Sequence, residues 1–183
     1  MGKRVNIGAP GSGNRKTMLL LMEEYEWPPR TFSMAMDLKP AEMARALCNN
    51  KLDAYVYVVG HPNGSIQETI ITCNARIIPI EGPRLNAFLK KHAFYTKAVI
   101  YGGIYRGVDE KINTFGPRAT LMTNADLPEE VAYQIVKAVF ENFDEFRSLH
   151  PALAPLTKEE MLTGNIAPFH PGAMRYYKEA GLM

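Results

Sequence analysis

The chain has 183 residues, of which 46% are hydrophobic and 22% are charged, and its formal net charge is +2 at pH 7. This composition excludes a disordered tail, a collagen-like repeat and a membrane-spanning protein. The basic excess is small and scattered along the chain, which argues against a nucleic-acid-binding protein. The length fits one domain, or one domain and part of another.

The first half of the chain alternates short β-prone runs with segments of helical periodicity. We expect strands at residues 4–8, 31–36, 52–59 and 76–80, and helices at residues 14–25, from Pro40 onward, at 65–72 and at 83–91. The run 52–59 is nearly all apolar, which favours a strand buried on both faces of a parallel sheet. This alternation predicts an α/β fold with right-handed crossovers and a mostly parallel sheet.

The second half of the chain follows another pattern. Residues 95–108 hold glycines and tyrosine-flanked turns, and we expect an excursion there rather than a core element. Residues 112–122 fit one long strand, interrupted at 116–117. Residues 128–146 give the clearest helical signal, followed by short helices and loops. The apolar face predicted for this helix consists of Val131, Ile135, Ala138, Val139, Phe143 and Phe146.

The cysteines and histidines give no sign of a metal site. Cys48 and Cys73 lack a C-x-x-C spacing and neighbouring histidines, so they are neither a zinc site nor a disulfide framework. Both lie among apolar residues, which favours two buried thiols over a single disulfide and leaves the redox compartment undecided. The four histidines share no ligand spacing, so we expect no metal.

The N-terminus carries no recognisable targeting signal. Residues 1–4 are followed by a run much shorter than the apolar core of a signal peptide, and no window approaches 18 consecutive apolar residues. We therefore expect that this chain alone is not exported.

The most informative local signal is the glycine loop at residues 8–14, Gly-Ala-Pro-Gly-Ser-Gly-Asn. A strand, glycines and a helix start leave several backbone N–H groups unpaired and directed at one spot, where the helix dipole also favours an anion. The loop therefore predicts a site for a carboxylate or a phosphate. The alternative is a tight strand-to-helix turn that holds no ligand.

Two nucleotide-binding interpretations of this loop are possible. A Walker A loop is excluded, because Asn14 stands at the lysine position and Lys16 would point away from the phosphates. The dinucleotide-binding motif G-x-G-x-x-G requires a third glycine that this chain lacks, because Lys16 stands at that position. Asp37, after the second predicted strand, does resemble the acidic residue that binds the ribose in such proteins. A nucleotide-dependent enzyme that binds phosphate at Gly11-Ser12-Gly13 therefore remains the alternative function.

Further candidates lie near this loop or in other loops. Arg15 is a candidate for pairing with a second ligand carboxylate, or else a solvated surface residue. His61, after Gly60, follows a central strand and lines a pocket or is an ordinary loop residue. Tyr105 offers its ring to a cleft or packs internally. No catalytic triad, carboxylate pair or cofactor motif emerges, so we expect a binding protein rather than an enzyme. The predicted ligand-binding residues are Gly11, Ser12, Gly13, Asn14, Arg15, Gly60, His61 and Tyr105.

Four segments carry a resemblance to a known family. They are residues 2–13 (GKRVNIGAPGSG), 52–64 (LDAYVYVVGHPNG), 133–142 (YQIVKAVFEN) and 168–177 (PFHPGAMRYY). Taken in order along nearly the whole chain, they resemble the TAXI family, the solute-binding subunits of TRAP (tripartite ATP-independent periplasmic) transporters. The resemblance implies a type II periplasmic-binding-protein fold, in which two α/β lobes close on a small organic anion.

The resemblance also implies a function and a domain organisation. It implies binding of a glutamate-like amino acid or dicarboxylate in the periplasm, delivery to a membrane permease, and ligand contacts from the amides of residues 11–13. The family often has Thr where this chain has Asn14. The chain resembles a member that begins at the second lobe: residues 3–110 would form that lobe, and residues 111–183 a return crossing and helices that brace the absent first lobe. Such a truncated fragment is expected to self-associate through the helix at 128–146.

Overall fold

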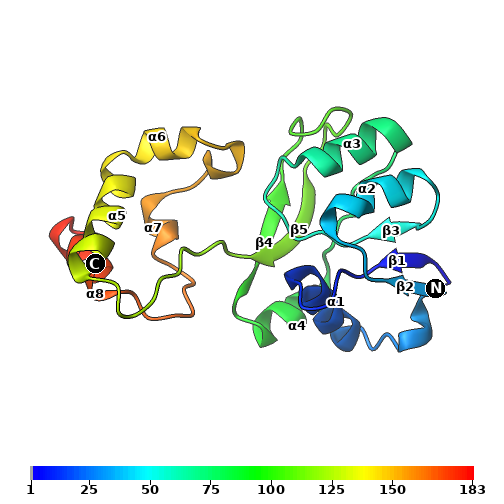
Figure 1. Ribbon diagram of the computed structural model, residues 1–183, viewed down its shortest axis with the longest axis horizontal. Coiled ribbons are helices and arrows are strands. Elements are labelled where there is room, and N and C mark those ends of the chain that lie inside the picture. The colour runs from blue at the N-terminus through cyan, green and yellow to red at the C-terminus, as the bar shows by residue number, and fades with distance from the viewer. Residues whose placement is uncertain (1) are drawn as a thin grey trace. The chain divides into compact units, whose positions relative to one another are not determined.

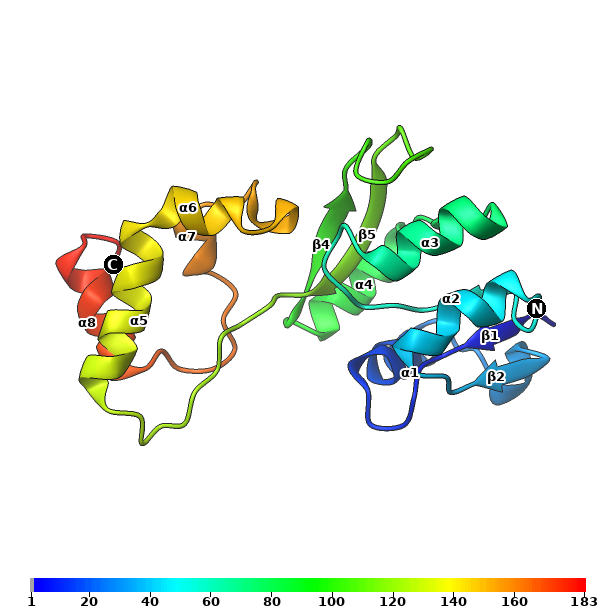
Figure 2. The ribbon, with the colours of Figure 1, turned by 45° about the horizontal axis from the view of Figure 1, so that its top comes forward.

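The computed structural model describes residues 2–183, which form two compact units, one ending at Gly116 and one running from Pro117 to Met183. Figures 1 and 2 show the helices and strands of both units. Within the described residues, no helix combines the length and the apolar character needed to cross a membrane.

The N-terminal unit contains a parallel three-stranded sheet (Figure 1). Its strands are β1 (Arg4–Asn6), β2 (Met34–Met36) and β3 (Ala54–Tyr55), in the order β2-β1-β3. The connections contain α1 (Gly13–Glu24), a 3-10 turn η1 (Pro29–Thr31) and α2 (Pro40–Cys48), and α3 (Gly64–Cys73) follows β3. The prediction of an α/β fold with a parallel sheet, of the kind found in a periplasmic-binding-protein lobe, is confirmed.

A second sheet in the same unit corrects one sequence-based prediction. After α4 (Pro83–Lys91), strands β4 (Tyr95–Ile100) and β5 (Ile112–Pro117) pair as a two-stranded sheet. The expectation of a peripheral excursion at residues 95–108 was wrong, because Tyr95, Ile100 and Tyr105 are almost completely buried. Tyr95 and Tyr105 supply core packing here, since their rings bury large apolar surfaces, whereas Tyr101 is 53% exposed.

Other strands are shorter than the sequence suggested. Residues 76–80 form no strand: Pro79 has no N–H, and a single ladder-like bond joins Ile80 N–H to Asn113 O at 3.0 Å. β3 covers only two residues of the run 52–59, and both are half-buried rather than buried on two faces. Past β3, Val56 N–H still donates to Asn6 O at 3.1 Å, and Val58 N–H then donates to the side chain of Asn14. β5 ends at Pro117, which likewise cannot donate.

The C-terminal unit consists of helices and loops. Its elements are α5 (Glu129–Glu141), α6 (Phe143–Ser148), the 3-10 turn η2 (Pro151–Leu153), α7 (Lys158–Met161) and α8 (Pro171–Glu179). Its core joins α5 to α8 through Phe140, Ala173, Tyr176 and Tyr177. A Cβ on Gly172 would collide with the backbone carbonyl of Glu129, so this glycine permits the close packing.

The long helix predicted at 128–146 is interrupted, and its buried face differs from the expected one. Asn142 separates α5 from α6, and its side-chain Nδ2 donates to Ala138 O at 2.9 Å, competing with helix continuation. The buried positions of α5 are Ala132 and Phe140. Val131 and Ile135, which we expected on the covered face, are 44% and 42% exposed.

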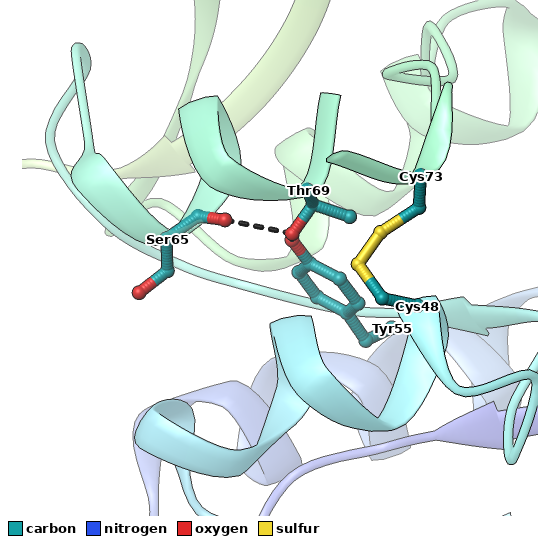
Figure 3. The surroundings of a disulfide bond; sticks show 5 residues. All are labelled: Cys48, Tyr55, Ser65, Thr69 and Cys73. Carbon is teal, nitrogen blue, oxygen red and sulfur yellow. Dashed lines mark hydrogen bonds between the residues drawn. A yellow bond between two sulfur atoms is a disulfide. The ribbon is translucent and has the colours of Figure 1, made fainter. Parts of the chain in front are cut away.

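A disulfide joins Cys48, the last residue of α2, to Cys73, the last residue of α3 (Figure 3). The expectation of two free thiols was therefore wrong: the Cα atoms lie 5.1 Å apart, although 25 positions separate them in sequence. Beside the bridge, the Tyr55 hydroxyl lies 3.0 Å from Thr69 Oγ1, which donates to Ser65 O at 2.7 Å. Disulfides persist in oxidising compartments such as the bacterial periplasm.

An ion pair ties the start of β1 to the residue before β3. The Arg4 guanidinium lies 2.8 Å from Asp53 Oδ1 and also bonds Asn50, while Arg4 N–H donates to Asp53 Oδ2 at 2.7 Å. These bonds lower the pKa of Asp53 to about 2. A carboxylate with a lowered pKa stabilises the fold above its unfolded pKa of about 3.9, and this contribution is lost as the pH falls through the folded value.

We therefore expect Asp53→Asn to lower the melting temperature at neutral pH. The variant should approach wild type as the pH falls from about 4 to about 2, where Asp53 of the folded wild type also becomes protonated. Thermal unfolding at several pH values measures this, with Asp109→Asn, at an exposed loop aspartate, as the matched control. A difference between Asp53→Asn and wild type that stays constant from pH 7 to about pH 2 would contradict the role of the ion pair.

Candidate functional site

Two loops leave the carboxyl ends of the neighbouring parallel strands β1 and β3. The first, residues 7–12, leads into α1, and the second, residues 56–63, leads into α3. Ligand sites of open α/β sheets lie at this edge, because the amino ends of the following helices are directed there. Seven of the eight predicted binding residues lie in these loops or in the first turn of α1.

The loop before α1 is held by a compact set of hydrogen bonds around Ser12. Ser12 Oγ donates to Ala9 O at 2.7 Å and accepts from Arg15 N–H at 3.2 Å, so Ser12 is the N-cap of α1. Ser12 N–H also donates to Ala9 O at 3.1 Å. Gly8 has a φ of +97°, and a Cβ there would lie 2.7 Å from Arg15 N. The turn therefore requires glycine at position 8.

The amino end of α1 remains able to bind an anion. Among residues 2–183, no acceptor bonds the N–H groups of Gly11 or Gly13, and both glycines are exposed. The first turn of α1, which the structure describes in full, contains no acidic residue. Unpaired N–H groups and the positive end of the helix dipole attract a carboxylate or phosphate oxygen.

The helices that follow β2 and β3 have amino ends that are closed by their own side chains. At α3, Asn63 Oδ1 accepts from Ser65 N–H at 3.0 Å and from Ile66 N–H at 3.3 Å. At α2, Lys39 N–H donates to Glu42 Oε2 at 2.9 Å, and Pro40 brings no N–H to the first turn. α1 is therefore the better anion site of the three.

Asn14 and Arg15 brace the loop. Asn14 is 7% exposed, and its Oδ1 accepts from Val58 N–H at 2.8 Å, which joins the two loops. Asn14, which stands where a Walker A loop has its lysine, is thus buried and already hydrogen-bonded to Val58. Arg15 is half-buried, and its Nη1 donates to Gly8 O at 3.2 Å, which leaves its positive charge beside the amino end of α1.

His61 and Tyr105 form a separate hydrogen-bonded group at the amino end of α3. Tyr105 is 1% exposed and packs with Ile66 and Ile100, so its ring does not line an open cleft. Its hydroxyl accepts from Asn63 N–H at 2.9 Å and lies 2.7 Å from His61 Nδ1. Burial lowers the pKa of His61 and raises the pKa of Tyr105. Both side chains are therefore neutral at pH 7.

The structure thus sorts the predicted residues into two groups, residues 11–15 at α1 and the trio Gly60, His61 and Tyr105 at α3. The hydrogen bond from Val58 N–H to Asn14 Oδ1 is the link between the two loops. Sequence reasoning missed Asn63, although an Asn before Gly-Ser at a helix start is a recognisable N-cap signal. Within residues 2–183, no group of three or more potential metal ligands is found.

A comparison with protein-family models matches residues 1–181 to the NMT1-like family. This family includes periplasmic solute-binding proteins, and its members typically bind a substrate without transforming it. The match extends over both compact units, and the parallel sheet with an accessible helix amino end fits this assignment. The chain belongs to the NMT1-like family.

Proposed function

We propose that this protein is a solute-binding component of a TRAP-type secondary transporter, similar to the TAXI family, and that it binds a small carboxylate. The solute is a glutamate-like amino acid or a dicarboxylate, which is released to a membrane permease. The observation that carries the proposal is the amino end of α1, where the N–H groups of Gly11 and Gly13 have no acceptor among residues 2–183.

The chemistry of this site suits reversible binding. Backbone N–H groups donate to a carboxylate without bringing a counter-charge of their own, and the Ser12 turn fixes their directions before the solute arrives. Arg15 lies beside the loop and bonds it through Nη1, so the remaining edge of the guanidinium is suited to a second carboxylate. A dicarboxylate would then be preferred over a monocarboxylate.

Two features support a periplasmic location for this protein. The family suggests the periplasm. The Cys48–Cys73 disulfide requires an oxidising environment for its formation, which the periplasm provides. Solute capture outside the cytoplasmic membrane is the step that precedes uptake through a permease.

A thermal-shift panel tests this function. We expect glutamate, 2-oxoglutarate or succinate to raise the melting temperature, by an amount that corresponds to about 2.7 kcal/mol when the solute is at 100 times its Kd. NAD and ATP are expected to have no effect. A shift with NAD or ATP alone would favour the nucleotide-dependent enzyme instead.

Arg15→Gln in the same panel tests the role of the guanidinium. This variant should reduce the shift caused by dicarboxylates and leave that of monocarboxylates nearly unchanged, whereas Lys16→Gln, at an exposed neighbour, is the matched control. A uniform loss with both classes of solute would contradict this role.

A further inference from the structure

His61 has two ring nitrogens in different surroundings. Its Nδ1 lies 2.7 Å from the Tyr105 hydroxyl, and the two rings meet edge to face with centroids 5.7 Å apart. No residue in the range 2–183 bonds Nε2. The side chain is half-buried, so one edge of the ring is held against Tyr105 and the other edge is available to a partner.

The hydrogen bonds of Tyr105 favour one of the two neutral tautomers of His61. The Tyr105 oxygen already accepts the N–H of Asn63 at 2.9 Å. The hydroxyl proton of Tyr105 is therefore free to be donated to Nδ1 of His61. A neutral imidazole that accepts at Nδ1 carries its proton at Nε2. Because Tyr105 is 1% exposed and packed against Ile66 and Ile100, its hydroxyl is held in this position.

We propose that His61 is a second anchor for the bound carboxylate, donating from Nε2–H, and that Tyr105 is the positioning residue that fixes this tautomer. This proposal rests on the function proposed above. The His61 loop leaves β3 at the same edge of the sheet as the loop that leads into α1. At the amino end of α3, the N–H groups of Ser65 and Ile66 already donate to Asn63 Oδ1. The donor that this loop can still offer to a ligand is therefore the His61 side chain.

Tyr105→Phe separates positioning from packing, because it removes the hydroxyl and keeps the ring. In wild type at about pH 8, above the ordinary imidazole pKa, ¹⁵N spectra should show the His61 proton on Nε2. In Tyr105→Phe the Nδ1-protonated tautomer should become populated, since Nδ1 loses its donor. Tyr101→Phe is the matched control, because Tyr101 lies in the same turn region and is 53% exposed.

Solute affinity supplies the second readout. Tyr105→Phe and His61→Phe should each weaken carboxylate binding by about fivefold, the worth of one hydrogen bond. In the His61→Phe background, Tyr105→Phe should cause no further loss, because a positioning residue acts only through the residue it positions. Additive losses would overturn the positioning role.

The outcomes for this proposal and for the proposed function differ. If wild type binds a carboxylate and His61→Phe binds it equally well, the anchoring role is refuted while the function stands. If wild type binds no carboxylate, the proposed function is refuted and the anchoring role with it. An unchanged His61 tautomer in Tyr105→Phe refutes positioning whatever the affinities.

Discussion

Replacing both Cys48 and Cys73 by alanine should lower the free energy of unfolding of the N-terminal unit by about 3.5 kcal/mol, the chain-entropy expectation for the loop that this disulfide closes. The bridge spans 25 positions in sequence and joins the ends of two packed helices, α2 and α3. Removing the bridge raises the conformational entropy of the unfolded chain much more than that of the folded unit, so unfolding becomes more favourable. Urea unfolding followed by the fluorescence of Trp27 measures this, because Trp27 is the only tryptophan of the chain and lies in this unit.

Reduction of the wild-type protein provides the control for this prediction. A reductant should lower the stability of wild type to that of the double variant and should leave the double variant unchanged. Equal stability of the double variant and oxidised wild type, within about 0.5 kcal/mol, would contradict a stabilising bridge.

Gly8→Ala should be the most damaging single change at the candidate site. The φ of +97° disfavours any side chain, and the new Cβ would lie 2.7 Å from Arg15 N and 2.8 Å from Asn14 Cβ. Relief requires the first turn of α1 to open, which disturbs the Ser12 cap. We expect a loss of about 2–4 kcal/mol in the free energy of unfolding, from strain and overpacking together, and loss of carboxylate binding.

Gly11→Ala is the matched control for this change. Its φ of +76° is also positive, but no atom lies within 4 Å of the position of the new Cβ. Only the backbone strain remains, which costs about 1 kcal/mol. Denaturant unfolding of both variants measures the difference. Equal losses for the two variants would show that close packing around Gly8 is not what holds the loop.

Local signals predicted much of the fold. The helix starts at Pro40 and Pro83 and the strand–helix alternation through α3 follow from proline geometry and hydrophobic periodicity, which act within a few residues. The errors concern pairings between distant segments. β4 is a core strand because it pairs with β5, and Cys48 meets Cys73 because α2 packs on α3. Neither contact leaves a local pattern in the sequence.

The candidate site likewise has features that local sequence signals predict and features that depend on contacts between distant residues. The accessible amino end of α1 was predictable, because glycines and an N-cap serine act on their own turn. The buried position of Tyr105 was not, because it depends on packing against Ile66 and Ile100 from other elements. The side-chain bond from Asn14 to Val58 spans 44 positions, which is also beyond the reach of local patterns.

The central claim is that a carboxylate binds at the amino end of α1, and amide NMR tests it at the level of single N–H groups. Uniformly ¹⁵N-labelled protein is titrated with succinate and with glutamate, and the amide signals of Gly11 and Gly13 are followed. The account predicts saturable shifts of both signals toward the values of strongly hydrogen-bonded amides, while the signal of Gly181, in the C-terminal unit, stays in place. Binding of the same solutes that leaves Gly11 and Gly13 unmoved would contradict the account.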